Sequence, residues 1–116
     1  MVHDWKALPV TPTATGERRV ICAGPTVTLL SLKAHVTTVR AGTAAHAAHR
    51  HPDEELVVVK EGLVEATING RARQGGPGTV FFFAANDEHG LRNTGPAEAT
   101  YYVFRMVTPA PPSAAN

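Results

Sequence analysis

The sequence has little cysteine: Cys22 is the only one among 116 residues, so no disulfide can form within the chain. Small domains that lack disulfides depend on a hydrophobic core, and a chain of this length can bury one. We therefore expect one domain. Nothing in the cysteine usage favours an oxidising compartment, and a cytoplasmic location is the expectation.

Long apolar runs and an excess of one charge are also missing. No segment approaches the roughly 20 apolar residues that a membrane-spanning helix needs, and residues 1–12 lack the basic and apolar stretches of a secretory signal. The formal net charge is +1, with both signs mixed along the chain. This pattern disfavours nucleic acid and acidic membranes as partners and leaves a small-molecule ligand as the expected one.

No helical apolar period of useful length is present. Instead, short segments rich in Val, Thr and aromatic residues alternate with turn residues at intervals of about 8–12 residues, which is typical of an all-β sandwich or barrel. The predicted strands are 19–23, 26–32, 35–40, 46–51, 55–61, 63–69, 79–83, 89–93 and 99–107. Asn69-Gly70 predicts a tight hairpin, because both residues tolerate positive φ.

The two ends of the chain differ from the middle in composition and lack its strand-like pattern. Residues 1–17 contain two prolines and no periodicity, and we expect an arm that packs loosely or against a partner subunit through Trp5 and Leu8. Residues 18–107 form the predicted barrel. The proline-rich segment 108–116 predicts a disordered tail.

Two predicted strands are apolar on both faces. Val57, Val58 and Val59 are consecutive, and so are Phe81, Phe82 and Phe83. A strand of this kind is covered on both sides, whereas the outer face of a single small barrel contacts water. A homodimer is the simplest arrangement that covers it.

The segment 49–55 carries the strongest chemical signal. His49 and His51 are two residues apart, so on an extended strand their side chains would leave the same face roughly 6.6 Å apart. Glu55 keeps the same parity and can join them if the chain bends at Pro52. Two imidazoles and a carboxylate form most of a metal site. The alternative is a surface strand with polar residues turned outward.

A second segment completes the pattern. It begins with Gly78, continues as the predicted strand 79–83 and a polar turn, and ends with His89 and, four residues later, Asn93. Together, residues 42–62 and 78–93 resemble the two motifs of the cupins, which have a double-stranded β-helix, or jelly-roll, barrel. One extra residue separates Gly42 from the first histidine. Ala84 and Asn86 replace the usual proline and glycine of the turn, where asparagine tolerates left-handed φ.

The resemblance implies a metal site made of His49, His51, Glu55 and His89. Nitrogen and oxygen ligands without thiolate suit a divalent transition metal such as Fe, Mn, Ni, Co, Zn or Cu. Three imidazoles and one carboxylate leave coordination positions open, as in catalytic sites.

Residues of two further strands are predicted to border the pocket; the alternative is that they are ordinary core residues. His35 and Thr37 lie on a strand that borders the pocket, and so do Tyr102, Phe104 and Met106 on the last strand. Tyr102 and His35 are the candidate acid–base residues.

Two functions fit the sequence. The first is a metal-dependent enzyme, of dioxygenase or isomerase/cyclase type, that acts on a small organic molecule. The second is a non-catalytic barrel in which the metal holds a ligand, as in a sensor or storage protein.

Overall fold

The computed structural model describes residues 1–109, so most of the predicted tail lies outside the described residues. A short 3₁₀ helix (Trp5–Ala7) precedes nine strands. The strands are β1 (Val10–Pro12), β2 (Gly16–Gly24), β3 (Ser31–Val39), β4 (Glu54–Glu61), β5 (Val64–Ile68), β6 (Arg71–Gly75), β7 (Val80–Phe83), β8 (His89–Asn93) and β9 (Ala99–Val107). No helix in this part of the chain is long and apolar enough to cross a membrane.

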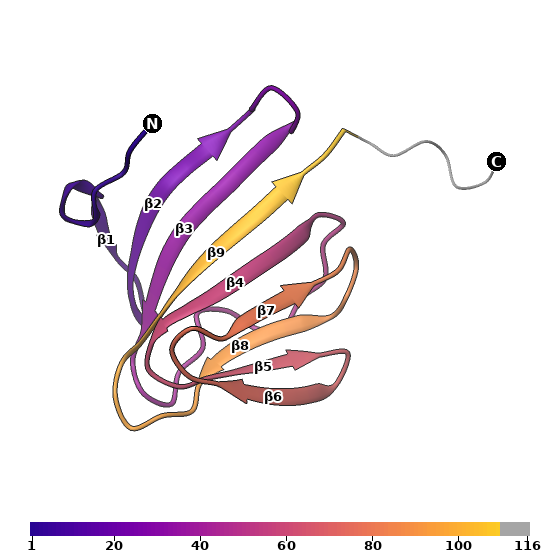
Figure 1. The fold of residues 1–116 in the computed structure, drawn as a ribbon. Coiled ribbons are helices and arrows are strands. Elements are labelled where there is room, and N and C mark those ends of the chain that lie inside the picture. The colour runs from indigo at the N-terminus through magenta and orange to yellow at the C-terminus, as the bar shows by residue number, and fades with distance from the viewer. Residues whose placement is uncertain (110–116) are drawn as a thin grey trace.

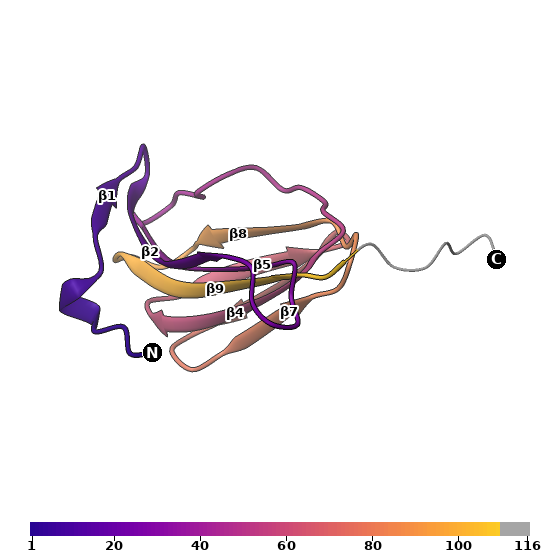
Figure 2. The ribbon, with the colours of Figure 1, turned by 90° about the horizontal axis from the view of Figure 1, so that it is seen from above.

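The strands form two antiparallel sheets (Figure 1). The larger has the order β1-β2-β3-β9-β4-β7, and the smaller has the order β6-β5-β8. The sheets pack face to face (Figure 2). Alternate residues of β4, β7 and β8 enter the core between them, among them Val57, Val59, Phe83 and Leu91. The predicted all-β jelly-roll barrel is confirmed.

Residues with positive φ form two of the predicted turns. Asn69 and Gly70 have φ values of 48° and 82° and connect β5 to β6 as a hairpin. Asn86 has a φ of 65° in the turn that precedes β8. Asparagine therefore adopts here the left-handed backbone conformation that glycine usually takes at this point of the turn.

Two predicted strands are wrong. Residues 46–51 form a loop, in which His49 makes one isolated β-bridge with His89. Ala48 crosses closely over Gly90, where an added Cβ would lie 3.3 Å from Ala48. The segment 26–30 is a turn rather than a strand, so β3 begins only at Ser31.

The N-terminal arm packs on its own sheet. β1 pairs with β2, and the Trp5 ring meets the Tyr102 ring edge-on at 6.3 Å. Arg19 and Lys60 lie over the same indole, at 4.3 and 4.4 Å from its centroid. The arm thus covers part of the outer face of the large sheet, where a loose arm or a partner subunit was expected.

The outer face of β7 is not covered in the same way. Phe81 and Phe83 enter the core, whereas Val80 and Phe82 are 55% and 49% exposed. Val58 of β4, which pairs with Val80 of β7, is half-buried. An apolar patch therefore remains at the edge of the large sheet.

Candidate metal centre

Four side chains from three segments meet at one end of the barrel interior. Glu55 lies at the start of β4, His89 begins β8, and His49 and His51 belong to the loop between β3 and β4. Their ligand atoms all lie within 4.8 Å of one another. The structure therefore brings together the four residues that the sequence singles out, although the two histidines come from a loop rather than a strand.

Backbone hydrogen bonds fix the two segments to each other. The amide of His49 donates to the carbonyl of His89, and the amide of His89 donates to the carbonyl of His49, both at 2.9 Å. The amide of Asn86 also donates to the carbonyl of His51, at 2.9 Å. These bonds position the imidazoles independently of any ion.

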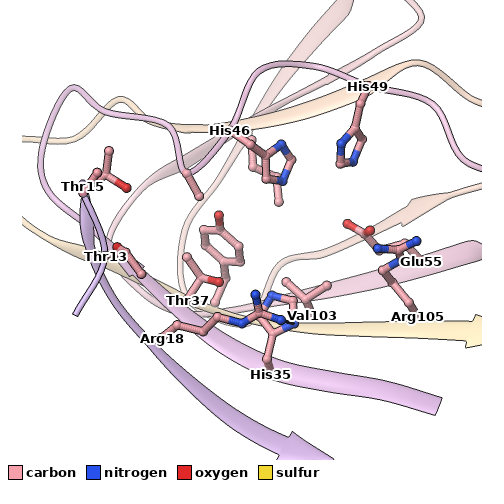
Figure 3. Close-up of a pocket in the computed structure, with 14 residues that line it drawn as sticks. Thr13, Thr15, Arg18, His35, Thr37, His46, His49, Glu55, Val103 and Arg105 are labelled. Carbon is pink, nitrogen blue, oxygen red and sulfur yellow. Dashed lines mark hydrogen bonds between the residues drawn. The ribbon is translucent and has the colours of Figure 1, made fainter. Parts of the chain in front are cut away.

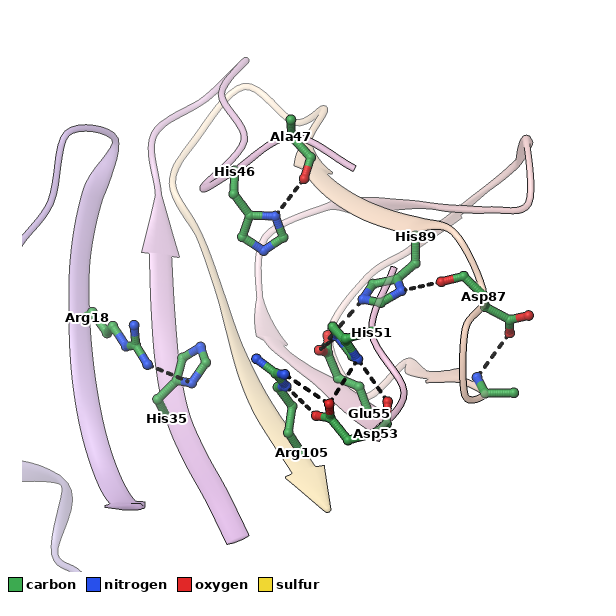
Figure 4. Close-up of polar contacts among 11 residues, drawn as sticks. Arg18, His35, His46, Ala47, His51, Asp53, Glu55, Asp87, His89 and Arg105 are labelled. Atoms are coloured by element: carbon green, nitrogen blue, oxygen red, sulfur yellow. Dashed lines mark hydrogen bonds and ion pairs between the residues drawn. The ribbon is translucent and has the colours of Figure 1, made fainter. Parts of the chain in front are cut away.

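Two of the histidines have a defined tautomer. The Nδ1 atom of His51 lies 2.8 Å from the carbonyl oxygen of Asp53, and that of His89 lies 2.9 Å from the carbonyl oxygen of Asp87 (Figure 4). Because a carbonyl only accepts, each Nδ1 carries the proton. The Nε2 lone pairs are then directed at the cluster, as in metal-binding histidines.

Unpaired polar atoms at the centre fit a metal ion. The Nε2 atoms of His49 and His89 are buried and have no hydrogen-bond partner. Such an atom costs about 1–3 kcal/mol when it is left unsatisfied. Glu55, 5% exposed, places Oε1 3.2 Å from Nε2 of His51 and 3.7 Å from Nε2 of His89. A divalent cation at this point would satisfy the nitrogen lone pairs and the carboxylate together.

Burial keeps His49 in the form that can bind a metal. Desolvation, followed by the nearby charge of His46, lowers the pKa of His49 to about 4. The ring is therefore neutral at pH 7. The His46 ring stacks on it, with centroids 4.3 Å apart.

An ion pair between Arg105 and Asp53 lies beside the cluster. Arg105 of β9 donates to both carboxylate oxygens of Asp53, at 2.6 and 3.0 Å. This bidentate bond holds the pKa of the Asp53 carboxyl below its usual range. Arg105 pairs with Glu55 across the β4–β9 ladder, so Asp53 and Glu55 flank the same guanidinium.

A cavity of about 270 Å³ lies against the cluster. His49 and Glu55 line one side of it, and residues of β2, β3 and β9 line the others (Figure 3). Three imidazoles and one carboxylate leave coordination positions for a further ligand. The cavity provides the space for that ligand.

The two predicted acid–base residues lie in different places. His35 lines the cavity. Tyr102 does not; it lies on the opposite face of β9, between Trp5 and Phe104. The expectation that Tyr102, Phe104 and Met106 border the pocket is wrong, because β9 presents the alternate residues to the interior. Its inner positions are those of Tyr101, Val103 and Arg105.

Sequence reasoning missed Arg18, Asp53, Tyr101 and Arg105. Burial raises the pKa of Tyr101, so its hydroxyl stays protonated beside the cavity. Strand alternation could have placed Tyr101 and Arg105 on one face, but the apolar residues of the other face favoured the wrong parity. Arg18 and Asp53 carry no motif.

Comparisons with known proteins support the same conclusion. A family model described as a cupin domain matches residues 35–105, whereas no curated protein matches the chain.

Solved structures with the same fold come from several organisms. An RmlC-like cupin from Shewanella frigidimarina is 16% identical, with a TM-score of 0.72 over 90% of this chain and 87% of that chain. A predicted oxalate decarboxylase from Thermotoga maritima is 15% identical, with a TM-score of 0.73 over 92% of this chain and 99% of that one. KdgF from Halomonas sp. is 21% identical, with a TM-score of 0.64 over 77% and 76% of the two chains. At these identities the similarity shows the fold alone. Because the matched residues span more than half of the sequence and include all four clustered side chains, the chain belongs to the cupin domain family.

Proposed function

We propose that this protein is a metal-dependent enzyme that acts on a small organic molecule. His49, His51, Glu55 and His89 hold a divalent transition metal, Fe, Mn, Ni, Co, Zn or Cu. The observation that carries this proposal is the pair of buried Nε2 atoms of His49 and His89, which have no hydrogen-bond partner among residues 1–109. His49 also lines the cavity. Buried polar atoms without partners are rare in proteins unless they serve a site.

The bound ion supplies Lewis-acid or dioxygen chemistry, which fits a dioxygenase or an isomerase/cyclase. The chain binds and orients the organic molecule beside it. Tyr101, protonated because it is buried, offers a hydroxyl donor. His35 offers a neutral imidazole, since burial and the adjacent Arg18 lower its pKa to about 4. Tyr101 takes the place that the sequence suggested for Tyr102.

Metal analysis and oxygen uptake test the proposal. Protein purified without oxygen should contain a stoichiometric transition metal, and Glu55→Gln should lose it. The Fe(II) form should consume oxygen with a phenolic or dicarbonyl compound if the protein is a dioxygenase; an isomerase/cyclase should convert such a compound without oxygen uptake. A wild type that takes up no metal from any of the six ions would contradict the proposal.

A non-catalytic ligand-binding barrel is the second candidate. One observation favours it: among residues 1–109, Glu55 is the only carboxylate that lines the cavity, and it is a proposed metal ligand. An enzyme that moves protons with a carboxylate has none free here. A tightly held ligand in the purified protein, without turnover on any metal, would support this alternative.

The apolar patch on β7 supports a homodimer. Val80 and Phe82 are both about half exposed at the edge of the large sheet. Exposed apolar side chains on an edge strand are typical of a subunit interface. We propose that a second copy of the chain covers this patch.

A further inference from the structure

The side of the cavity away from His49 carries a cation and an imidazole that the metal site does not use. Arg18 comes from β2 and His35 from β3, and both line the cavity. In Figure 3 they lie across the cavity from His46 and His49. The cavity therefore connects the proposed metal site with these two side chains.

Arg18 is the lining residue with an unbalanced charge. Three charged side chains line the cavity: Arg18, Glu55 and Arg105. Arg105 is bound bidentately by Asp53, and Glu55 points into the histidine cluster. Among residues 1–109, Arg18 has no carboxylate within ion-pair distance, and its guanidinium contacts Nδ1 of His35 at 3.3 Å. One positive charge beside the cavity is thus left for a ligand.

The contact with His35 prepares both side chains for an anion. A guanidinium can only donate, so Nδ1 of His35 accepts this bond. Burial, followed by the charges of Arg18, Arg105 and His46, lowers the pKa of His35 to about 4, and the ring is neutral at pH 7. Its proton is then on Nε2, which gives the cavity wall a second donor next to the guanidinium (Figure 4).

The number of charges and donors indicates the chemical class of the ligand. One guanidinium with an imidazole N–H matches the two oxygens and the single charge of a carboxylate. Many sites that bind phosphate esters add a lysine or a helix N-terminus. Among residues 1–109, no lysine lines this cavity, and its volume of about 270 Å³ suits a small molecule.

We propose that Arg18 and His35 bind a carboxylate of the ligand, so that the substrate is a small organic acid held at one end by the metal and at the other by Arg18. This inference rests on the proposed function, since it takes the histidine cluster as the other anchor. It adds the charge of the substrate and the residue that selects it.

Two matched series of hydroxamates test the two anchors separately. The hydroxamate head chelates the metal, and the chain of three to six carbons ends in a carboxylate in one series and in a carboxamide in the other. Calorimetry on Zn(II)-loaded protein measures both affinities. We expect the best carboxylate to bind about 10- to 100-fold more tightly than its carboxamide partner, the range for a charge-assisted hydrogen bond.

The variant Arg18→Gln should abolish this preference while keeping the carboxamide affinity and the zinc content. Arg18→Lys, which keeps the charge without the fork, should retain part of the preference. Arg73→Gln removes another exposed arginine, which lies on β6, and should change nothing.

Four outcomes would overturn the inference. Equal binding of the two series, or an unchanged preference in Arg18→Gln, would remove the carboxylate assignment while leaving the metal site intact. Tighter binding of a matched series with a phosphonate tail would replace carboxylate by phosphate chemistry. A wild type that neither holds zinc nor binds any hydroxamate would overturn the proposed function and this inference with it.

Discussion

Replacing His89 with alanine tests whether the four side chains act as one metal site. His89 is 1% exposed and stacks on Phe83, with ring centroids 4.3 Å apart. Truncating a large buried side chain costs about 2–5 kcal/mol. The change also removes a buried Nε2 without a partner, which costs about 1–3 kcal/mol in the metal-free wild type. We therefore expect a net loss of about 1–3 kcal/mol and a barrel that still folds.

The response to metal should change much more than the fold. Free metal at 100 times its Kd adds about 2.7 kcal/mol of stability, and a domain of this size gains roughly 4 °C in Tm for each kcal/mol. The wild type should gain about 10 °C. If His89→Ala binds about 100-fold more weakly, the same concentration adds about 0.4 kcal/mol, or roughly 2 °C.

Thermal unfolding with metal and with chelator, together with elemental analysis, measures both quantities. His3→Ala is the matched control, because it removes an exposed imidazole of the N-terminal arm. It should keep the full metal response. An equal rise in Tm and equal metal content in His89→Ala would refute the four-residue site.

Three further changes test the surroundings of the site and the assembly. The Asp53 carboxyl has a lowered pKa, so its ion pair stabilises the fold above the ordinary pKa of 3.8 and loses this effect as the pH falls below that value. Asp53→Asn should therefore lower the free energy of unfolding in urea by about 1.5–3 kcal/mol at pH 7 and by less at pH 3. Gly62→Ala should destabilise the fold by about 1–3 kcal/mol, since Gly62 has a φ of +86° and a Cβ there would lie 2.6 Å from Ala99. Gly76→Ala, whose added Cβ would have no described atom within 4 Å, should unfold at nearly the wild-type urea concentration. Phe82→Asp should shift the protein toward monomer in sedimentation, and a wild type already monomeric at working concentration would contradict the dimer.

The sequence predicted His49, His51 and Glu55 from their local spacing, whereas His89 was assigned through the resemblance to the second cupin motif. The spacing of His49, His51 and Glu55 along the chain limits how far apart their side chains can lie. Asn86 in the turn and Phe83 in the strand before it position His89 in the same local manner. The hairpin at Asn69-Gly70 follows from backbone sterics alone.

The parity of β9 could not be predicted from its own residues. Tyr102 and Phe104 are the more apolar set and resemble a core face, yet they lie on the outer face, where Trp5 covers Tyr102. Arg105 resembles a solvated residue, yet it faces inward because Asp53 neutralises it. Both contacts join residues at least 52 positions apart. Such long-range pairs leave no periodic signal.

The loop before His49 was predicted as a strand because alternate histidines match the period of two. Pairing ends after one bridge, and Ala48 instead crosses over Gly90, where an added Cβ would lie 3.3 Å from Ala48. A side chain at Gly90 would therefore require the loop to shift slightly. This crossing depends on the arrangement in space, which the order of residues does not show.

The loop from Gly42 to His49 is anchored at both ends by backbone bonds to β8. The amide of Gly42 donates to the carbonyl of Asn93, and His49 is bonded in both directions to His89. The segment 44–47 can therefore be lengthened or shortened without displacing His49, whereas Ala48 packs over Gly90. Because Ala45 and His46 also line the cavity, insertions in this loop would reshape the opening while the ligand set stays in place. New substrates could in this way be accommodated by a chain that keeps its chemistry.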